Sequence, residues 1–166
     1  LIVLLTFKIM RTAVFPGSFD PFTLGHLDIL ISSLRLFDKV IIAVGYNVQK
    51  KGFYTVEERM DIIRKSVAHI QNVEVTSYSG LTVEFCRQNN INFIIRGLRT
   101  TTDFELERVI AQANTKMNSD VLTVFIPSGH EFSFISSTVV RDVLQNGGDA
   151  SEFMPKGVDL KDYKKE

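Results

Sequence analysis

The apolar residues of this chain follow two patterns that alternate along its length. Short runs of β-branched and other apolar residues are typical of strands, whereas apolar residues that recur every three to four positions are typical of helices. The first pattern predicts strands at 12–15, 39–44, 73–77, 93–95 and 121–126. The second pattern predicts helices at 26–37, 55–70, 81–89, 101–117 and 136–144.

Two of the predicted helices carry further local signals. Thr55 and Glu58 have the spacing of a capping box, in which each side chain binds the main-chain N–H of the other residue. The long helix at 101–117 places several apolar residues on one face. They are Leu106, Val109, Ile110, Ala113 and Met117.

The alternation of strands and helices predicts a doubly wound α/β fold with a five-stranded parallel, Rossmann-like sheet. The run Lys-Val-Ile-Ile-Ala-Val at 39–44 suits a parallel strand covered by helices on both faces. A chain of 166 residues is long enough for one such core. We therefore expect one domain at 10–166, preceded at 1–9 by an N-terminal extension or a cloning remnant.

Charge and cysteine content narrow the classes of partner. The chain has 19 basic and 19 acidic residues, so no general field attracts nucleic acid, and a polyanion must be held by a few placed cations. No apolar run approaches the roughly 20 residues of a membrane helix, so no membrane partner is expected. The single cysteine, Cys86, excludes an internal disulfide, fits the cytoplasm, and is predicted to be a buried structural thiol.

The crossing from the first strand to the first helix is a candidate ligand site. It reads Phe-Pro-Gly-Ser-Phe-Asp-Pro-Phe-Thr-Leu-Gly-His at 15–26. We expect Gly17 to let the backbone approach a ligand closely. Gly25 and His26 fall in the first helical turn, where unpaired N–H groups and the helix dipole favour phosphate. For an isolated Gly-His pair, a tight turn with a solvent-facing histidine would be the alternative.

A second candidate phosphate site is the start of the helix at 136–144. Ser136, Ser137 and Thr138 can offer N–H and hydroxyl donors, although a helix cap alone would explain Ser136 or Ser137. The chain has no Walker loop, no Gly-x-Gly-x-x-Gly fingerprint and no cysteine-histidine cluster, which disfavours a kinase-type cradle, ordinary NAD binding and zinc. Two phosphate-binding helix starts favour a nucleotide ligand.

Four separated motifs together resemble the phosphopantetheine adenylyltransferase family of the nucleotidyltransferase superfamily. They are the crossing at 15–26, the lysine pair at 50–51, Arg-Gly-Leu-Arg at 96–99 and Ile-Ser-Ser-Thr-Val-Val-Arg at 135–141. The resemblance implies the strand order 3-2-1-4-5, with the topological switch between the first and fourth strands. The first and third motifs follow those two strands, so both indicate the same crevice.

The resemblance also implies an activity. The phosphate of 4'-phosphopantetheine would attack the α-phosphorus of ATP, giving dephospho-coenzyme A and pyrophosphate in coenzyme A biosynthesis. A phosphate monoester with a second pKa near 6 is mostly ionised at pH 7, so no general base is needed. Catalysis would then depend on positioning and on cations.

Further partners follow from the resemblance alone. It implies Mg²⁺ held mainly by the phosphates of ATP and by water, with no metal site formed by protein residues. It implies a homohexamer. Dephospho-coenzyme A, and coenzyme A as a feedback ligand, are the other ligands expected.

Residue roles are implied by position within the resemblance. His26, Lys50 and Arg99 would be catalytic, with His26 stabilising the transition state at the α-phosphate. Acceptor binding would involve Ser18, Lys50, Thr82 and Arg96, and Lys51 is the alternative to Lys50. The residues implied in ATP binding are Ser18, Phe19, His26, Gly97, Leu98, Arg99, Glu107, Phe132, Ser133, Phe134, Ile135, Ser136, Ser137 and Thr138.

Two alternative functions stay open. A sister nucleotidyltransferase acting on nicotinamide mononucleotide or glycerol phosphate would share the crossing and the Ser-Ser-Thr motif, but would not call for the 96–99 segment with Lys50. A catalytically silent nucleotide-binding module is the second alternative, against which the intact His26 argues. Ser18, Leu106 and Phe132 stand where many family members have threonine, tyrosine and tryptophan, which affects adenine and pantetheine packing more than chemistry.

Overall fold

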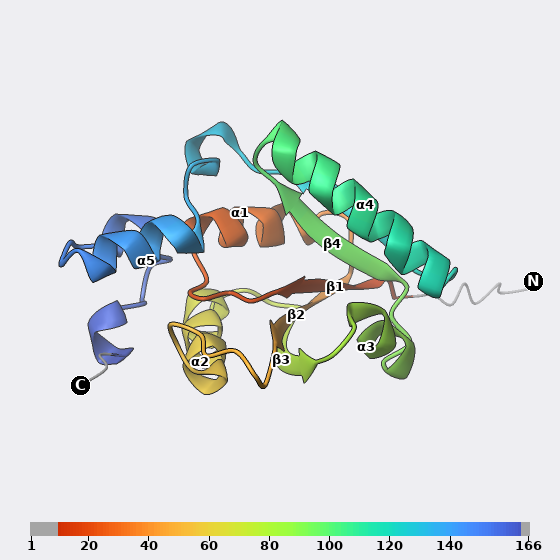
Figure 1. Ribbon diagram of the computed structural model, residues 1–166, viewed down its shortest axis with the longest axis horizontal. Coiled ribbons are helices and arrows are strands. Elements are labelled where there is room, and N and C mark those ends of the chain that lie inside the picture. Colours follow the sequence, from red (N-terminus) through yellow and green to blue (C-terminus); the bar gives the residue numbers. More distant parts are fainter. Residues whose placement is uncertain (1–9, 164–166) are drawn as a thin grey trace, which may run out of the picture.

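Five parallel strands form one central sheet (Figure 1). The computed structural model describes residues 10–163, so the expectation for residues 1–9 lies outside the described residues. The strand order is β3-β2-β1-β4-β5, which confirms the order implied by the family resemblance. The strands are β1 (Thr12–Gly17), β2 (Lys39–Tyr46), β3 (Val73–Ser79), β4 (Phe93–Leu98) and β5 (Leu122–Pro127).

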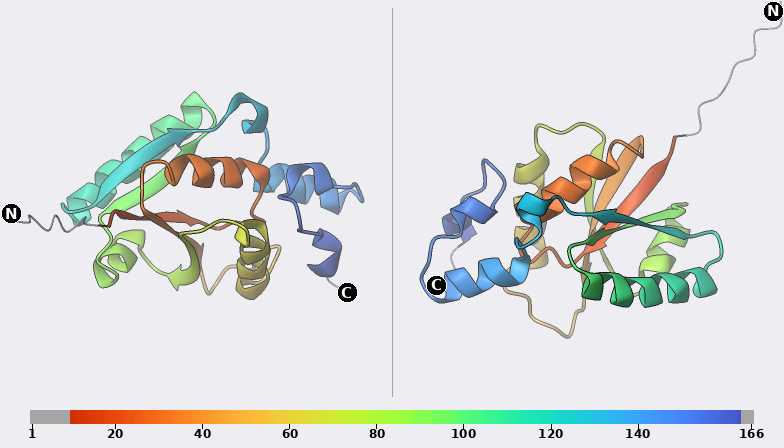
Figure 2. Two further views of the ribbon diagram at one scale, coloured as in Figure 1. Left: turned by 180° about the vertical axis from the view of Figure 1, so that it is seen from behind. Right: turned by 90° about the horizontal axis from the view of Figure 1, so that it is seen from above.

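Helices connect the strands in the alternation that the sequence predicts. The α-helices are α1 (Leu24–Ser33), α2 (Val56–Val67), α3 (Thr82–Gln88), α4 (Thr101–Met117) and α5 (Ser137–Gln145). Short 3₁₀ helices follow at η1 (His130–Phe132), η2 (Ser151–Phe153) and η3 (Leu160–Tyr163). The described part of the chain begins at β1 and ends, in blue, at the opposite side of the molecule (Figures 1 and 2).

The strand side chains alternate between two hydrophobic cores, as expected for a sheet covered on both faces. In β2, Ile42 belongs to the larger core and Ile41 to the smaller one. The larger core includes Ile29 of α1 and Ile63 of α2, and the smaller includes Cys86 of α3. Burial raises the pKa of the Cys86 thiol to about 11, which confirms the prediction of a buried structural cysteine.

β1 and β4 separate before they end, and this separation creates a crevice. β1 pairs with β2 along its whole length, from Thr12 to Gly17. It pairs with β4 only at Ala13 and Val14, whereas β4 continues to pair with β5 as far as Leu98. The gap therefore lies at the switch point of the strand order, where ligands bind in open α/β sheets.

β4 is longer than the sequence prediction. Arg96 and Gly97 were expected to follow the strand, but both lie within it and pair with Phe125 and Ile126 of β5. A charged residue followed by glycine is typical of the end of a buried strand. β4 nevertheless continues, because its neighbour β5 continues to pair with it. The guanidinium of Arg96 is accommodated because its side of β4 faces the crevice and not a hydrophobic core.

α1 begins and ends earlier than the predicted range of 26–37. Thr23 is the N-cap, which still leaves Gly25 and His26 in the first turn, as predicted. After Ser33 the chain forms tight turns, and Phe37 reaches the hydrophobic core from these turns. The apolar residues therefore extend beyond the end of α1, because the turns that follow the helix also place a side chain in the core.

α2 has the predicted cap. The Thr55 hydroxyl accepts from the Glu58 N–H at 3.2 Å, and the Glu58 carboxylate accepts from the Thr55 N–H at 2.7 Å.

The apolar face of α4 is exposed. The bounds of this helix match the prediction, but none of its residues is buried. Leu106 is 63%, Val109 56% and Met117 47% exposed. The Phe104 ring meets the Phe125 ring of β5 edge-on, with 5.8 Å between centroids, and this contact joins the helix to the sheet.

Candidate active site

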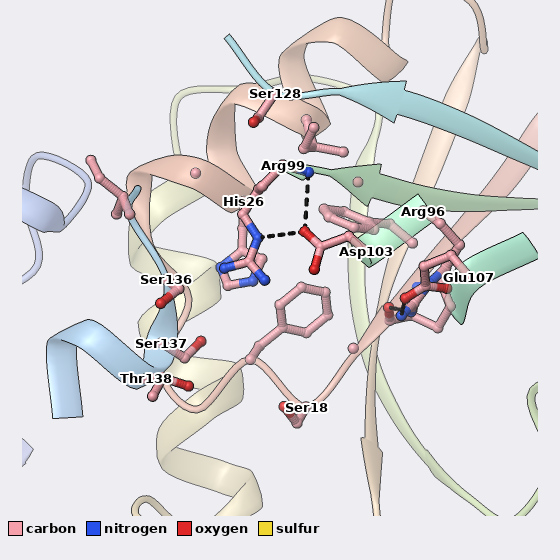
Figure 3. A pocket seen from close by; sticks show the side chains of 18 of the residues that line it. Ser18, His26, Arg96, Arg99, Asp103, Glu107, Ser128, Ser136, Ser137 and Thr138 are labelled. Atoms are coloured by element: carbon pink, nitrogen blue, oxygen red, sulfur yellow. Dashed lines mark hydrogen bonds and ion pairs between the residues drawn. The ribbon is translucent and has the colours of Figure 1, made fainter. Parts of the chain in front are cut away.

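A cavity of about 300 Å³ lies where β1 and β4 separate. Its walls come from the β1–α1 crossing, the end of β4, the first turns of α4 and the first turn of α5. Figure 3 shows Ser136, Ser137 and Thr138 on one side of this cavity and Arg96 and Glu107 on the other. The two helix starts that the sequence indicated, at α1 and α5, therefore meet in one site.

His26 lines this cavity and also caps its own helix. Its imidazole Nδ1 accepts a hydrogen bond from the main-chain N–H of Thr23 at 3.0 Å, and the Thr23 hydroxyl lies 3.0 Å from the same nitrogen. A ring nitrogen that accepts from an N–H carries no proton, so the proton of the neutral ring is on Nε2. The Nε2–H group is thus the donor that His26 keeps for a ligand.

The His26 ring is neutral at physiological pH. Burial, followed by the positive charges of Arg99 and Arg96, lowers the pKa of His26 from 6.5 to about 3. Two aromatic rings lie against the imidazole: Phe19 meets His26 edge-on at 5.1 Å between centroids, and Phe22 stacks on it at 5.4 Å. His26 can therefore donate a hydrogen bond to an anion but does not attract it as a cation.

Phe19 has an uncommon backbone conformation in the turn that precedes α1. Its φ of 45° lies in the left-handed region, although the residue is aromatic and only 2% exposed. A Cβ on Gly17 would lie 2.8 Å from the Phe19 ring. Gly17 thus makes room for this ring. Gly17 also lines the cavity, and its expected close approach to a ligand stays a prediction.

Gly25 allows another close contact. A Cβ at this position would lie 2.8 Å from the main-chain oxygen of Ile135 and 3.4 Å from that of Phe132. Only a glycine lets the first turn of α1 pack this closely against the segment that leads into α5. The packing brings the two helix starts together.

Arg96 connects three elements around the crevice. Its guanidinium forms a two-point ion pair with the Glu107 carboxylate of α4, in which the Nε contact is 2.7 Å. Its Nη1 donates to the main-chain oxygen of Pro16 in β1 at 2.8 Å. The side chain therefore bridges the gap between β1 and β4 at the end where their main chains no longer pair.

Arg99 also has an acidic partner on α4. Its main-chain N–H and its Nε both donate to the Asp103 carboxylate, at 3.1 and 3.2 Å. Asp103 and Glu107 are four residues apart and share one face of the helix. One face of α4 thus supplies counter-ions to both arginines of the Arg-Gly-Leu-Arg motif.

The first turn of α5 is tied to the β1–α1 crossing. Ser136 is the N-cap, with its hydroxyl accepting from the Val139 N–H at 3.2 Å, and Ser137 donates its hydroxyl to Pro21 O at 2.8 Å. Arg141 donates to Asp20 O at 2.6 Å and to the Thr138 hydroxyl at 3.2 Å. Ser137 uses its hydroxyl proton within the protein, whereas the hydroxyls of Ser136 and Thr138 only accept in these contacts. The hydroxyls of Ser136 and Thr138 and the first main-chain N–H groups of α5 are therefore the donors left for an anion.

Ser18 lines the cavity, but the lysine pair does not. Lys50 and Lys51 lie on an exposed loop between β2 and α2. Thr82, the first residue of α3, is bonded through its hydroxyl to Tyr78 at 2.7 Å and is also outside the cavity lining. The acceptor-binding roles of Lys50 and Thr82 stay predictions.

The predicted site residues as a whole fall into two groups, those that line the cavity and those that lie outside it. The cavity lining includes Ser18, Phe19, His26, Arg96, Gly97, Arg99, Glu107, Ile135, Ser136, Ser137 and Thr138. The residues outside it are Lys50, Thr82, Leu98, Phe132, Ser133 and Phe134. Phe134 is 62% exposed, and its ring lies 6.5 Å from the ring of Phe153, measured between centroids.

Three polar residues of the lining had no predicted role: Asp103, Ser128 and Arg141. The spacing of Asp103 from Arg99 at a helix start could have indicated an ion pair. Arg141 belongs to the motif at 135–141, whose resemblance implied no role for it. Ser128, which follows β5, has no such signal.

No group of three or more His, Cys, Asp or Glu side chains within residues 10–163 could hold a metal ion. None of the helices in this part of the chain is long and apolar enough to cross a membrane.

The sequence and the fold are both similar to those of known proteins. The chain matches the family model described as "Cytidylyltransferase-like" over residues 14–143. Solved structures with the same fold include a bifunctional NMN adenylyltransferase/ADP ribose pyrophosphatase from Francisella tularensis, with a TM-score of 0.68 and 19% identity. That match covers 92% of this chain, which spans about half of the larger protein (47%). At this identity the likeness concerns the fold alone.

Curated relatives are closer in sequence. A phosphopantetheine adenylyltransferase from Flavobacterium psychrophilum is 47% identical over 152 residues, covering 92% of this chain and 100% of the relative. One from Haemophilus influenzae is 44% identical, covering 90% and 96%. One from Synechococcus elongatus is 46% identical, covering 88% of both chains. The chain that builds this cavity therefore belongs to the phosphopantetheine adenylyltransferase family of nucleotidyltransferases.

Proposed function

We propose that the cavity between β1 and β4 is the site where this enzyme transfers the adenylyl group of ATP to 4'-phosphopantetheine. The products are dephospho-coenzyme A and pyrophosphate. The observation that carries the proposal is His26, a neutral imidazole with its proton fixed on Nε2, in a cavity with two arginines and two helix N-termini. The family to which the chain belongs supports the choice of acceptor.

The reaction needs no general base from the protein. The acceptor phosphate is mostly ionised at pH 7, because its second pKa is about 6. One of its oxygens forms a bond to the α-phosphorus while the bond from that phosphorus to the α–β bridging oxygen breaks. The bridging oxygen keeps the electron pair and leaves as part of pyrophosphate. The chain has to bring two polyanions together and stabilise the developing charge.

His26 is the donor to the oxygens of the α-phosphate in this proposal. Negative charge on these and the bridging oxygen is redistributed in the transition state, and a donor held in place strengthens its hydrogen bond as that happens. Thr23 fixes the tautomer, and the rings of Phe19 and Phe22 hold the plane of the imidazole. The donor therefore needs no reorganisation during the reaction.

The cations act on two sides of the α-phosphate. We assign Arg99, Gly97 and the first N–H groups of α5 to the nucleotide, and Arg96 with Lys50 to the acceptor phosphate. Arg96 and Arg99 are both paired with carboxylates of α4. Each arginine would therefore exchange part of its contact with Glu107 or Asp103 for phosphate oxygens when substrates bind.

Mg²⁺ is expected to enter with the nucleotide. The two carboxylates that line the cavity, Asp103 and Glu107, are both bound to arginines, which disfavours a cage of protein ligands. We propose that phosphates and water hold the ion. When bound, it supplies charge neutralisation at the triphosphate.

The acceptor can be tested with pyrophosphate release from Mg-ATP. We expect release with 4'-phosphopantetheine, none with nicotinamide mononucleotide or glycerol phosphate, and formation of ATP from dephospho-coenzyme A and pyrophosphate. Activity only with nicotinamide mononucleotide would overturn the proposed acceptor. Failure with every acceptor would instead favour a silent nucleotide-binding module.

We also propose self-assembly, with the homohexamer implied by the family as the expected state. The exposed apolar face of α4, including Leu106, Val109 and Ile110, supports contacts with further copies. Sedimentation equilibrium should give about six times the chain mass for the natural sequence. Replacing Val109 by lysine should lower this mass, and an unchanged mass would place the interface elsewhere.

Dephospho-coenzyme A and coenzyme A are proposed as further ligands of the acceptor side, because both contain the phosphopantetheine arm. Coenzyme A should inhibit by competition with 4'-phosphopantetheine in initial-rate measurements.

The free thiol of Cys86 supports a reducing, cytoplasmic setting.

A further inference from the structure

Asp20 is a buried acid close to the cavity whose carboxylate has no role in the proposed chemistry. It lies in the β1–α1 crossing, two residues after Ser18, and is 8% exposed. Its Oδ2 accepts from the main-chain N–H of Phe53 at 2.7 Å, and its Oδ1 accepts from that of Tyr54 at 2.8 Å. Both oxygens of one carboxylate thus bind the segment that follows the lysine pair.

These contacts fix one end of the lysine loop. Gly52 alone separates Lys51 from Phe53, and the other end of the loop begins where β2 ends at Tyr46. A Cβ on Gly52 would lie 2.8 Å from Tyr54 O and 3.1 Å from the Oδ2 of Asp20. The loop therefore packs against Asp20 so closely that this position has room only for glycine.

Arg59 holds the same turn from the other direction. It is 6% exposed, and its Nη1 donates to the main-chain oxygen of Ser18 at 2.9 Å. Its Nη2 would lie 3.1 Å from a Cβ on Gly52. The lysine loop, the Ser18 turn and the start of α2 thus form one connected unit.

We propose that Asp20 is a positioning residue for acceptor binding: its carboxylate holds the lysine loop at a fixed distance from Ser18 and thereby places Lys50 for the acceptor phosphate. This inference rests on the proposed role of Lys50. Hydrogen bonds to a charged acceptor are about twice as strong as neutral ones, so two of them from consecutive N–H groups are well suited to hold a loop.

The Asp20→Asn variant tests the proposal. One side-chain oxygen can still accept, but the amide NH₂ would face a main-chain N–H, and two donors do not bond. We expect the KM for 4'-phosphopantetheine to rise about tenfold to a hundredfold, the effect of losing 1.5–3 kcal/mol in hydrogen bonds to a charged group. The KM for ATP should stay within about twofold. Amide exchange at Phe53 and Tyr54 should become faster.

Gly52→Ala is a second test of the same proposal. This variant keeps the Asp20 carboxylate, but the added methyl group pushes the lysine loop away from it. It should also raise the acceptor KM while leaving the ATP KM unchanged. Asp38→Asn is the matched control: Asp38 also accepts a main-chain N–H, from Arg11 at 2.9 Å, but it precedes β2 and so lies at the amino-terminal end of the strands, opposite to Asp20. Its kinetic constants should match those of the natural chain.

The double variant of Asp20→Asn with Lys50→Ala separates the two hypotheses. If both hold, the double variant has an acceptor KM close to that of Lys50→Ala alone, because a loop without its lysine gains nothing from being held. If Lys50→Ala leaves the acceptor KM unchanged, the proposed role of Lys50 fails. If Lys50→Ala raises it but Asp20→Asn does not, or if the two effects multiply, the positioning role of Asp20 fails.

Discussion

The main-chain N–H of Thr23 donates to Nδ1 of His26 at 3.0 Å, so a single hydrogen bond both caps α1 and determines which imidazole nitrogen carries the proton. The histidine occupies the N3 position, where glutamate or glutamine closes an ordinary capping box. Helix stability and the proposed catalytic donor thus depend on the same contact.

Two replacements of His26 should separate these effects. His26→Ala removes both the cap contact and the donor, whereas glutamine at the same position can still accept from Thr23. We expect the alanine variant to lose about a hundredfold to a thousandfold in kcat, the usual cost of one transition-state donor. The glutamine amide keeps an N–H on a more flexible side chain, so its loss in kcat should be smaller. Their KM for ATP should change much less.

Unfolding in urea should distinguish the two variants. The alanine variant should be less stable by about 1 kcal/mol, the typical loss of a cap, and the glutamine variant should be close to the natural chain. A kcat near normal in the alanine variant would contradict the role of His26.

The lowered pKa of His26 gives a pH dependence of stability with a definite sign. Between the native pKa of about 3 and the reference value of 6.5, the unfolded chain binds a proton that the folded chain does not. The free energy of unfolding should therefore fall as the pH is lowered from 6.5 towards 3, by at most about 1.4 kcal/mol per pH unit from this group. Above 6.5 the contribution is complete and constant.

Denaturant titrations at several pH values should show a shallower acid slope for His26→Gln than for the natural chain. A ring titration midpoint near 6.5 by NMR would show that the imidazole is not desolvated as described. The acid limb of kcat/KM near pH 6 should persist in both proteins, because it belongs to the acceptor phosphate.

Arg96→Ala and Lys50→Ala should mainly raise the KM for the acceptor, because both cations are assigned to the attacking phosphate. Arg96→Ala should have the larger effect, since it also leaves the Glu107 carboxylate, only 12% exposed, without its guanidinium. Arg87→Ala is a control, because Arg87 pairs with Glu84 on the surface of α3. Separate titration of the two substrates checks this assignment, and a defect confined to ATP affinity would reverse it.

Gly25→Ala should be destabilising even though alanine is the better helix former. The added Cβ would lie 2.8 Å from Ile135 O, and both the first turn of α1 and the segment before α5 would have to shift. We expect a loss of about 1–3 kcal/mol in the free energy of unfolding, together with reduced activity. Gly129→Ala, whose Cβ would come no closer than 3.5 Å to its neighbours, should have little effect by the same measurement.

The sequence predicted the sheet well because its signals are local. β2 is a continuous apolar run. The capping box formed by Thr55 and Glu58 marks the start of α2 within four residues. The boundaries that differed depend on partners far away in sequence. β4 continues through Arg96 because β5 continues beside it, and α1 ends before Phe37 because turns can also fill a core.

The site was predicted unevenly for a similar reason. His26 and Ser136 lie at helix starts, which can be located from the sequence and which are known to bind phosphate. The fold brings both to one cavity. Asp103 was not predicted because its role is to pair with Arg99, and this contact exists only when α4 has formed. Asp20 read as part of a turn motif, and its contacts with residues 53 and 54 cross more than thirty positions of sequence.

The separation of β1 from β4 after Val14 has a consequence for how this protein can change. The opening is made by main chain, since the two strands stop pairing there while each keeps its other neighbour. The gap between the two strands therefore does not depend on small side chains, although the glycines at 17, 25 and 97 of the lining are needed for close packing around it. Wall residues other than these glycines can therefore be exchanged, by evolution or by design, to alter which phosphate ester is recognised while the two strands keep their separation.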